Sequence, residues 1–257
     1  MQCKICKTEI KKCFSEKIMH KYEVDYFHCS NCDFVQTEEP YWLNEAYSRP
    51  INLSDTGYMK RNLFYSKRLT ILLYLLFGKN GRYLDYAGGY GVFVRLMRDI
   101  GFDFFWDDKF TQNLFSAGFE WDQNSHIDAI TLFEVFEHFS DPINEIKTLL
   151  KISDTLIFST DLHPNPLPKP KDWWFYGLDH GQHIAFYSRK TFELIAKKFN
   201  LNYYSLNSSS HILSKKNISS HKLKICRLDR IGLHKIINNF LLSKTESDYN
   251  LMTKNSL

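Results

Sequence analysis

The sequence predicts an α/β protein, with a doubly wound, mostly parallel sheet of seven strands behind a small metal-binding segment. Three observations support this fold class. Strands and helices alternate over residues 82–214, a glycine-rich turn joins the first of these strands to a helix, and acidic residues follow several strands. The ligands of such sheets lie beyond the carboxyl ends of the strands, so we expect the functional site there.

The individual elements follow from apolar periodicity and turn residues. Strands are predicted at residues 82–87, 102–106, 118–121, 127–134, 155–160, 201–206 and 211–214. Helices are predicted at residues 55–77 (one or two helices), 92–100, 113–117, 143–151, 188–199 and 232–242. Ser188 is expected to cap its helix, and the polar end of the chain to be a partner surface or a loosely ordered tail.

Four of the six cysteines form two C-x-x-C pairs near the N-terminus. They are Cys3, Cys6, Cys29 and Cys32. Two such pairs can place four thiolates tetrahedrally around Zn2+, and a segment this short has little core without the metal. We therefore predict a structural zinc ribbon with no open position for substrate. Cys13 and His28 are alternative ligands, and a redox role is a further alternative.

The glycine turn, Gly88-Gly89-Tyr90-Gly91, lets the backbone approach a ligand closely, and the helix start after it offers free N–H groups. A dinucleotide fingerprint counted from Gly89 needs a glycine at position 94, where the chain has Val94. NAD is therefore the weaker interpretation. Counted from Asp85, the pattern is D-x-A-x-G-x-G.

Acidic side chains at four predicted strand ends are expected to share one site: Asp85, Asp108, Glu134 and Asp161. Asp108 lies 23 residues after Asp85 (108 − 85), near the spacing of about 20 that puts an acidic residue beside a cofactor ribose. Its carboxylate can accept hydrogen bonds from both ribose hydroxyls. Asp107 is the alternative if the register shifts by one residue.

The segments LDYAGGYG, WDDKF and DAITLFEVFEHFSDP resemble successive motifs of class I methyltransferases that use S-adenosylmethionine (SAM), over roughly residues 80–213. Ala87 stands at the first glycine of the family's D-x-G-x-G-x-G motif. The resemblance implies a Rossmann-like fold and SAM as the cofactor. It implies that the methionine end of SAM lies at the turn, formed by Asp85, Tyr86, Ala87, Gly88, Gly89 and Gly91. It further implies that Asp108, with Lys109 beside it, binds the ribose, and that Phe133 and Glu134 lie near the methyl group.

The cysteine pairs in front of this domain narrow the resemblance to the sugar C-methyltransferase group, which carries an N-terminal zinc-binding domain. That group has a Y-H-E-H-x-x-Y-F-S segment after the fifth strand, and residues 181–188 match it here. His183 matches the second histidine, whereas Gly181 replaces the first. The resemblance therefore implies sugar methylation, with oxygen, nitrogen and carbon all open as the accepting atom.

Methyl transfer from a sulfonium is an in-line displacement, in which alignment supplies on the order of 7–11 kcal/mol. A hydroxyl, or a carbon beside a carbonyl, also needs a general base, and histidine suits that role. We favour His183, then His138, with His180 as a further candidate. Tyr187 either orients the substrate or belongs to the core. A divalent-metal site is an alternative for Asp161, His163, His180 and His183.

An aromatic segment follows a proline-rich loop at residues 164–170. Trp173, Trp174 and Tyr176 are expected either to stack on a sugar ring as a lid or to pack against the sheet. The net charge of +4, with both signs interspersed, predicts no nucleic-acid partner. The longest apolar run, at residues 69–77, is half of a bilayer span, so we expect a cytoplasmic protein without a membrane span.

Four regions are predicted: a zinc ribbon at 1–40, a helical linker at 41–80 that packs on the catalytic domain, a SAM-binding domain at 81–214 and a helical extension or tail at 215–257. The predicted function is methylation of a sugar or nucleotide-linked sugar in glycan (polysaccharide) or secondary-metabolite biosynthesis, with a homodimer left open. Two alternatives stand beside it: methylation of another small molecule or a protein, and a non-catalytic zinc-ribbon binding module.

Overall fold

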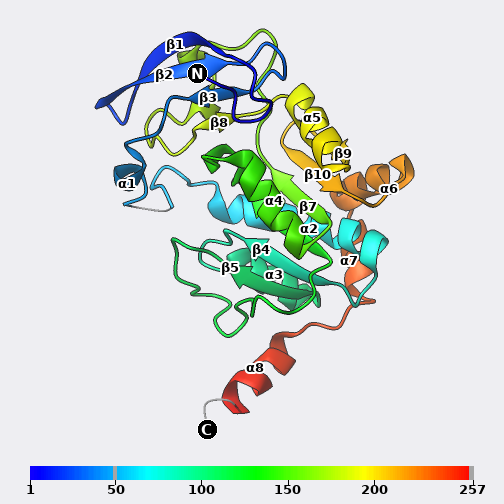
Figure 1. Cartoon of the computed structure of the whole chain (residues 1–257). Coiled ribbons are helices and arrows are strands. Elements are labelled where there is room, and N and C mark those ends of the chain that lie inside the picture. The colour runs from blue at the N-terminus through cyan, green and yellow to red at the C-terminus, as the bar shows by residue number, and fades with distance from the viewer. Residues whose placement is uncertain (49–50, 255–257) are drawn as a thin grey trace. The chain divides into compact units, whose positions relative to one another are not determined.

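The computed structural model describes residues 1–48 and 51–254 (Figure 1). Contacts divide the chain into two compact units. Unit 1 comprises Met1–Asn52 and Leu132–Lys216, and unit 2 comprises Leu53–Thr131 and Asn217–Leu257. Two sheets are present, a four-stranded one in the order β1-β2-β3-β8 and a six-stranded one in the order β5-β4-β6-β7-β10-β9.

Unit 2 contains the glycine turn and the first strands of the six-stranded sheet. Its elements are α2 (Tyr58–Phe77), β4 (Arg82–Tyr86), α3 (Val92–Ile100), β5 (Asp103–Asp107), the start of β6 (Ala129–Phe133), α6 (Ser220–Ile225), the 3-10 helix η4 (Cys226–Ile231), α7 (Leu233–Asn238) and α8 (Thr245–Lys254). β4 pairs in parallel with β5 and β6, so Asp85 lies opposite Trp106 and Thr131. This βαβ arrangement was predicted from the alternation of strands and helices.

Unit 1 contains the four-stranded sheet and the later strands of the six-stranded sheet. Its elements are β1 (Lys11–Ile18), β2 (Tyr22–His28), β3 (Val35–Thr37), α1 (Leu43–Ala46), η1 (Phe136–His138), α4 (Pro142–Ile152), β7 (Thr155–Ser159), η2 (Pro170–Asp172), η3 (Trp174–Tyr176), β8 (Ala185–Phe186), α5 (Arg189–Phe199), β9 (Asn202–Ser205) and β10 (Ser210–Ser214). β10 runs antiparallel to β7 and β9, which makes the larger sheet mixed.

The four-stranded sheet joins the N-terminal segment to a part of the chain 150 residues later. β8 pairs antiparallel with β3 through Val35 with Phe186 and Gln36 with Ala185. An aromatic core forms beneath this sheet and includes Tyr26, Trp42 and Phe175. The indole N–H of Trp42 also donates to the carbonyl of Gly181 at 2.8 Å. β3 and Trp42 therefore hold the backbone on the two sides of His183.

The larger sheet has six strands within residues 1–48 and 51–254, so the prediction of seven is not confirmed. The segment predicted as a strand at 118–121 makes one isolated bridge, between Trp106 and Glu120. The helix predicted at 113–117 is wrong, because the side chain of Asn113 accepts the N–H of Ser116 and closes a turn there. The helices α2, α3, α4 and α5 are confirmed, and Ser188 caps α5 by accepting the N–H of Thr191.

The polar end of the chain forms α8, for which no helix was predicted. Asp248 on α8 accepts hydrogen bonds from Nε and Nη2 of Arg98 at 2.8 and 2.7 Å, and from Arg95 at 3.0 Å. Arg98 and Asp248 are both buried, and a buried guanidinium is stable only with such a partner. An ion pair, which leaves no apolar periodicity in the sequence, therefore holds this helix.

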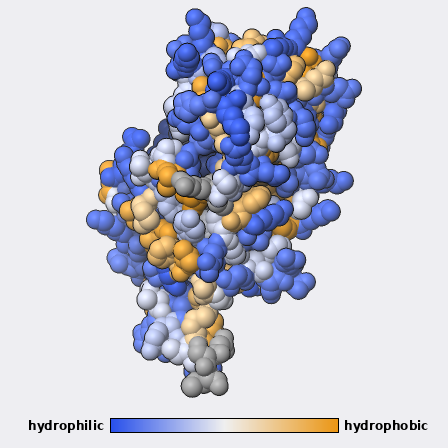
Figure 2. Space-filling model, turned by 90° about the vertical axis from the view of Figure 1, so that its left-hand side faces the viewer, coloured by the Kyte–Doolittle hydropathy of each residue, from blue (hydrophilic) through white to orange (hydrophobic). Residues whose placement is uncertain are grey.

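The hydropathy of the surface and of the helices is consistent with the amino-acid composition. The face in Figure 2 is mostly hydrophilic, with apolar residues scattered among the polar ones. Within the described residues, no helix combines the length and the apolar character needed to cross a membrane.

Candidate active site and metal centres

The strand end before the glycine turn carries a buried acid, Asp85. It is 3% exposed, and one carboxylate oxygen accepts the hydroxyl of Thr131 at 2.6 Å. Burial raises the pKa of Asp85 to about 7; the charge of Asp108 adds to the rise, and the bond from Thr131 opposes it. A buried carboxyl of this kind gains from a cationic group placed beside it. The strand end is therefore suited to an ammonium group.

The turn itself has a left-handed backbone. Ala87, Gly89 and Gly91 have φ of 56°, 57° and 81°. Alanine pays a steric cost in this region, which glycine avoids, so Ala87 is strained where the family motif has glycine. A Cβ on Gly88 would lie 2.9 Å from Oδ2 of Asp85 and from the ring of Trp106. These glycines therefore allow the chain to pack closely against itself at the turn.

The two acids at the end of β5 differ in their partners. Oδ2 of Asp108 accepts the N–H of Gly89 at 2.9 Å, and Oδ1 accepts those of Phe110 and Thr111 at 2.7 and 3.0 Å. The side chain of Asp107 makes no hydrogen bond within the described residues, and burial, followed by the charge of Asp108, raises its pKa. Asp108 thus holds the turn, whereas Asp107 has a carboxylate free for a ligand. Tyr86 is half-buried beside the turn, and Lys109 is exposed.

In unit 1, Phe133 ends β6 and Glu134 follows it with φ of 56°. The backbone N–H of Glu134 donates to Oγ of Ser159, and the hydroxyl of Ser159 donates back to the carboxylate of Glu134. Asp161 lies just after β7, and burial raises its pKa. The strand ends of unit 1 therefore carry two acids, one of which is fixed to the neighbouring strand.

Glu137 is the most unusual acid in the described chain. It is 0% exposed, and neither carboxylate oxygen has a hydrogen-bond partner. Ligand atoms of Glu137, His138 and His183 lie within 4.8 Å of one another. Burial, followed by the charge of Glu134, raises the pKa of Glu137 well above its usual value. Glu137 was not among the predicted site residues, although the pair Glu137-His138 directly after a strand is a signal that could have marked it.

The predicted catalytic histidines are brought together in unit 1. The rings of His138 and His180 lie 5.0 and 4.7 Å from that of His183. Burial, followed by the neighbouring histidines, lowers the pKa of His183 well below its usual value. Burial and then His180 lower that of His138 to about 3, with a bond to the Gln182 backbone opposing. His138 and His183 are therefore uncharged at neutral pH.

Hydrogen bonds fix the protons on two of these rings. Nδ1 of His183 lies 2.6 Å from the carbonyl oxygen of Phe175, so Nδ1 carries the proton and Nε2 carries the lone pair. In His180 the two ring nitrogens have the opposite roles, because Nδ1 accepts the N–H of Gln182 at 3.1 Å and the proton is therefore on Nε2. Nδ1 of His138 is 2.8 Å from the hydroxyl of Tyr47. Of these two fixed rings, His183 is the one whose Nε2 can accept a proton.

The other predicted substrate residues differ in exposure. Trp174 is 73% exposed, whereas Tyr176 is fully buried and donates its hydroxyl to the carbonyl of Pro168. Trp173 packs edge-on against Tyr176 and near Phe186. Tyr187 is also buried, and its hydroxyl donates to the carbonyl of Phe136 at 2.9 Å, next to Glu137. Among these side chains, Trp174 alone presents most of its surface to solvent.

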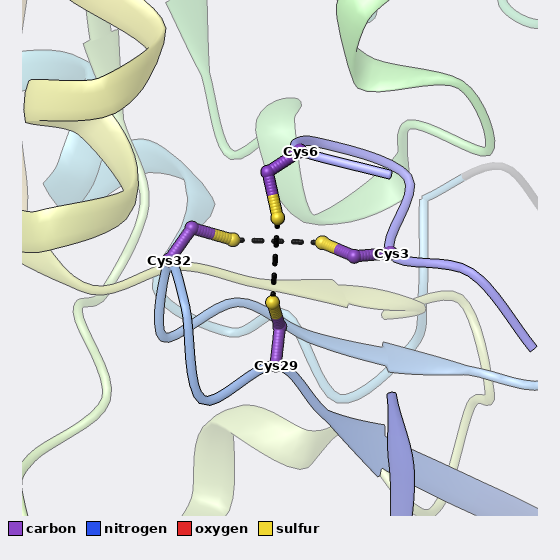
Figure 3. A group of neighbouring side chains, drawn as sticks. All are labelled: Cys3, Cys6, Cys29 and Cys32. Carbon is purple, nitrogen blue, oxygen red and sulfur yellow. Dashed lines mark hydrogen bonds between the residues drawn. The ribbon is translucent and has the colours of Figure 1, made fainter. Parts of the chain in front are cut away.

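The four cysteines of the N-terminal pairs point toward one centre (Figure 3). Their sulfurs all lie within 4.8 Å of one another, with Cys3 to Cys32 at 3.5 Å and Cys6 to Cys29 at 3.4 Å. The hydrogen bond from Cys32 lowers the pKa of Cys3 to about 5, so one thiolate is already favoured. The second pair is bound to α5, since Thr191 donates to the carbonyl of Cys32 at 2.9 Å.

The mixed sheet, the βαβ start and the glycine turn define an α/β fold. A family model described as a methyltransferase domain matches residues 59–206, more than half of the chain. The chain therefore belongs to the methyltransferase domain family.

Solved structures of methyltransferases resemble this chain at low identity. They include CalO1, from calicheamicin biosynthesis, at 15% identity over 67% of this chain and 61% of that one, with a TM-score of 0.45. The plantazolicin methyltransferase BpumL has 12% identity over 68% and 93%, with a TM-score of 0.48. Human N-acetylserotonin methyltransferase has 10% identity over 68% and 66%, with a TM-score of 0.43. The chain thus spans less than two thirds of CalO1. A search of curated proteins finds no match.

Proposed function

We propose that the protein methylates a sugar or a nucleotide-linked sugar, at an oxygen or a carbon whose proton is accepted by His183. The observation that carries this proposal is the bond from Nδ1 of His183 to the carbonyl of Phe175 at 2.6 Å. It fixes the tautomer in which Nε2 is a proton acceptor, and burial keeps that nitrogen unprotonated at neutral pH. An amine acceptor would have less need of such a base.

The cofactor is assigned to residues of unit 2. Asp85 is proposed to take the ammonium group of the methionine part, which would relieve the cost of its own burial. For the ribose we propose Asp107 in place of Asp108, because all three hydrogen bonds to Asp108 come from the backbone of its own loop and turn. When bound, SAM supplies an electrophilic methyl group. Phe133 and Glu134, predicted beside that methyl group, belong to unit 1, and their role stays a prediction.

The acceptor is assigned to unit 1. Trp174 is exposed and lies next to Phe175, whose carbonyl orients His183. An indole ring stacks well on the C–H face of a sugar, so Trp174 is proposed to hold the acceptor ring. Trp173 and Tyr176 are proposed to support this segment from below, since both pack in the aromatic core of unit 1.

The cysteine cluster is proposed to hold a structural zinc ion. Four sulfurs around Zn2+ at about 2.3 Å are roughly 3.8 Å apart, close to the 3.4 and 3.5 Å seen here. Lys7 and Asp33, each following its pair, have φ of 64° and 62°, and each donates to the carbonyl of the pair's first cysteine. The two pairs thus form matching knuckles. With four thiolates the ion would have no open position, so its role is to stabilise the N-terminal segment.

The proposal is tested by incubating the full chain with SAM and a panel of nucleoside-diphosphate sugars, free sugars, phenols and peptides. We expect S-adenosylhomocysteine to appear together with a product 14 mass units heavier from at least one sugar. Methylation confined to phenols or peptides would contradict the sugar acceptor. Product formation by His183→Gln at the wild-type rate would contradict the general base.

A further inference from the structure

The unpaired carboxylate of Glu137 requires an explanation. Buried polar atoms are nearly always hydrogen-bonded, and an exception often marks an ion or water that completes the site. Here both oxygens lack a partner at 0% exposure, and two uncharged histidines lie beside them. We propose that Glu137, His138 and His183 bind a divalent cation, and that this cation takes a hydroxyl oxygen of the acceptor as a further ligand. The second half of this inference rests on the proposed function, whereas the first half does not.

The spacing of the three side chains suits a single ion. Their ligand atoms are at most 4.8 Å apart, and two ligands on opposite sides of one cation, each at about 2.1 Å, are about 4.2 Å apart. Small side-chain rotations would therefore bring all three atoms into contact with one ion. The backbone needs no change, since Glu137 and His138 are neighbours in η1 and the N–H of Ile184 already bonds to the carbonyl of Glu137 at 2.9 Å.

The histidines are oriented as metal ligands usually are. A ligating imidazole commonly donates its other N–H to a carbonyl or carboxylate, which fixes the ring and raises its basicity. His183 has this arrangement through the carbonyl of Phe175, and the Tyr47 hydroxyl engages Nδ1 of His138. In His183 this leaves Nε2 for the cation, whereas a ring nitrogen of His138 would have to exchange its bond to the Gln182 backbone for the cation. Unprotonated rings are also what a metal requires, and burial provides that state.

The charge balance favours a cation over a neutral donor such as the hydroxyl of Thr160, which acts on Glu137 without reaching hydrogen-bond distance. The negative charges of Glu134 and Asp161 both act on Glu137, and no basic side chain of unit 1 pairs with it within the described residues. A divalent ion would offset this concentration of carboxylates. Two imidazoles and one carboxylate suit Mn2+, Fe2+, Co2+ or Zn2+, and three protein ligands leave positions open for water or substrate.

The open positions suggest what the cation does. A hydroxyl bound to it would lose its proton more easily, because the cation stabilises the alkoxide. The proton would pass to solvent, the oxygen would form its bond to the methyl carbon, and the carbon–sulfur bond would break with its electron pair going to sulfur. With the cation bound, His183 is a ligand and acts through the cation. Direct proton transfer to His183 would then apply to the cation-free protein only.

The first test is binding of Mn2+ to the full chain after a chelator wash and the return of one equivalent of zinc per chain, which the four thiolates take up in preference to the mixed-ligand site. Free Mn2+ gives a six-line paramagnetic resonance signal that weakens when the ion binds. We expect one tight Mn2+ per chain in the wild type, and at least tenfold weaker binding in Glu137→Gln and in His183→Gln. His211→Gln is the matched control, since His211 is also buried, lies in unit 1 and bonds to Thr160 instead.

The outcomes separate the two proposals. A folded wild-type chain that binds SAM but takes up no Mn2+ at millimolar concentration overturns the cation site, even if the variants fail to fold. Equal binding by Glu137→Gln and the wild type overturns it as well. Sugar methylation that is unaffected by chelation overturns the cation's role and leaves the proposed function standing. Tight Mn2+ binding without methylation of any sugar supports the cation site and removes the sugar acceptor.

Discussion

Two clusters of candidate metal ligands lie in unit 1, and they differ in how they are built. Cys3, Cys6, Cys29 and Cys32 come from two matching knuckles and converge as four like ligands. Glu137, His138 and His183 come from a 3-10 helix and a loop 45 residues apart (183 − 138), and they are three ligands of two kinds. Four thiolates close a zinc site, whereas three mixed ligands leave it open. The first cluster therefore suits stability and the second suits chemistry.

The largest expected effect is at the four-cysteine cluster, which is closed to further ligands. Cys29→Ser removes one of four thiolates, and structural zinc contributes on the order of 10 kcal/mol to the folding of small metal domains. We expect zinc content below one ion per chain and a large fall in melting temperature. Cys13→Ser is the control, because Cys13 lies on β1 and bonds only to the carbonyl of Tyr26. Full zinc content and unchanged stability in Cys29→Ser would remove the distinction between the clusters.

The second largest expected effect is at the cluster of Glu137, His138 and His183, which is open to further ligands. His183→Gln should lower kcat by about 10²–10⁴-fold, since it removes either the base or a ligand of the acceptor's cation. The affinity for SAM, measured by calorimetry, should stay within twofold, because the cofactor is assigned to unit 2. His211→Gln should keep the wild-type kcat. A loss of SAM affinity equal to the loss of kcat would mean that His183 acts by holding the fold and not by chemistry.

The third prediction concerns Asp85, the buried acid of unit 2, and compares it with Glu137. Asp85 has a hydroxyl partner but no histidine ligand beside it. Burial raises the pKa of Asp85 to about 7, so the stability it contributes is complete below its unfolded pKa of about 3.9 and is lost as pH rises through about 7. Wild-type stability should therefore fall by about 2–3 kcal/mol between pH 5 and pH 8 relative to Asp85→Asn, since about two of these pH units lie below the folded pKa. Urea unfolding without SAM measures this difference. Parallel pH curves for the two proteins would contradict the burial argument.

The smallest expected effect is on stability at the open cluster. Without a cation, Glu137→Gln replaces an unpaired buried carboxyl by a neutral amide, and the protein should become about 1–2 kcal/mol more stable at neutral pH. Added Mn2+ should stabilise the wild type and leave the variant unchanged. Thermal unfolding with and without Mn2+ measures both. A less stable Glu137→Gln would show that Glu137 has structural partners.

The difference between contacts that are local in the sequence and contacts between distant residues explains how much of the fold and of the candidate site could be predicted from the sequence. The cysteine pairs, the glycine turn and the helices α3, α4 and α5 were found because each depends on residues close together in the chain. His183, the third member of the Glu137 cluster, comes from a loop 46 residues after Glu137 (183 − 137), so no local pattern assembles that cluster. The proposal of Asp107 in place of Asp108 depends on which carboxylate bonds to the backbone of Gly89, which spacing does not reveal. Helix α8 depends on the Arg98–Asp248 pair, 150 positions apart.

The pairing of β8 with β3 limits how the protein can be divided into shorter fragments. A shortened version that starts after the ribbon would lack the neighbour of residues 185–186 and leave an unpaired strand edge directly after the histidine segment. Such a fragment would retain every residue of the glycine turn, yet its acceptor side would have lost its scaffold. The N-terminal strands should therefore be kept together with residues 181–188 in any engineered version, and not exchanged as a separate module.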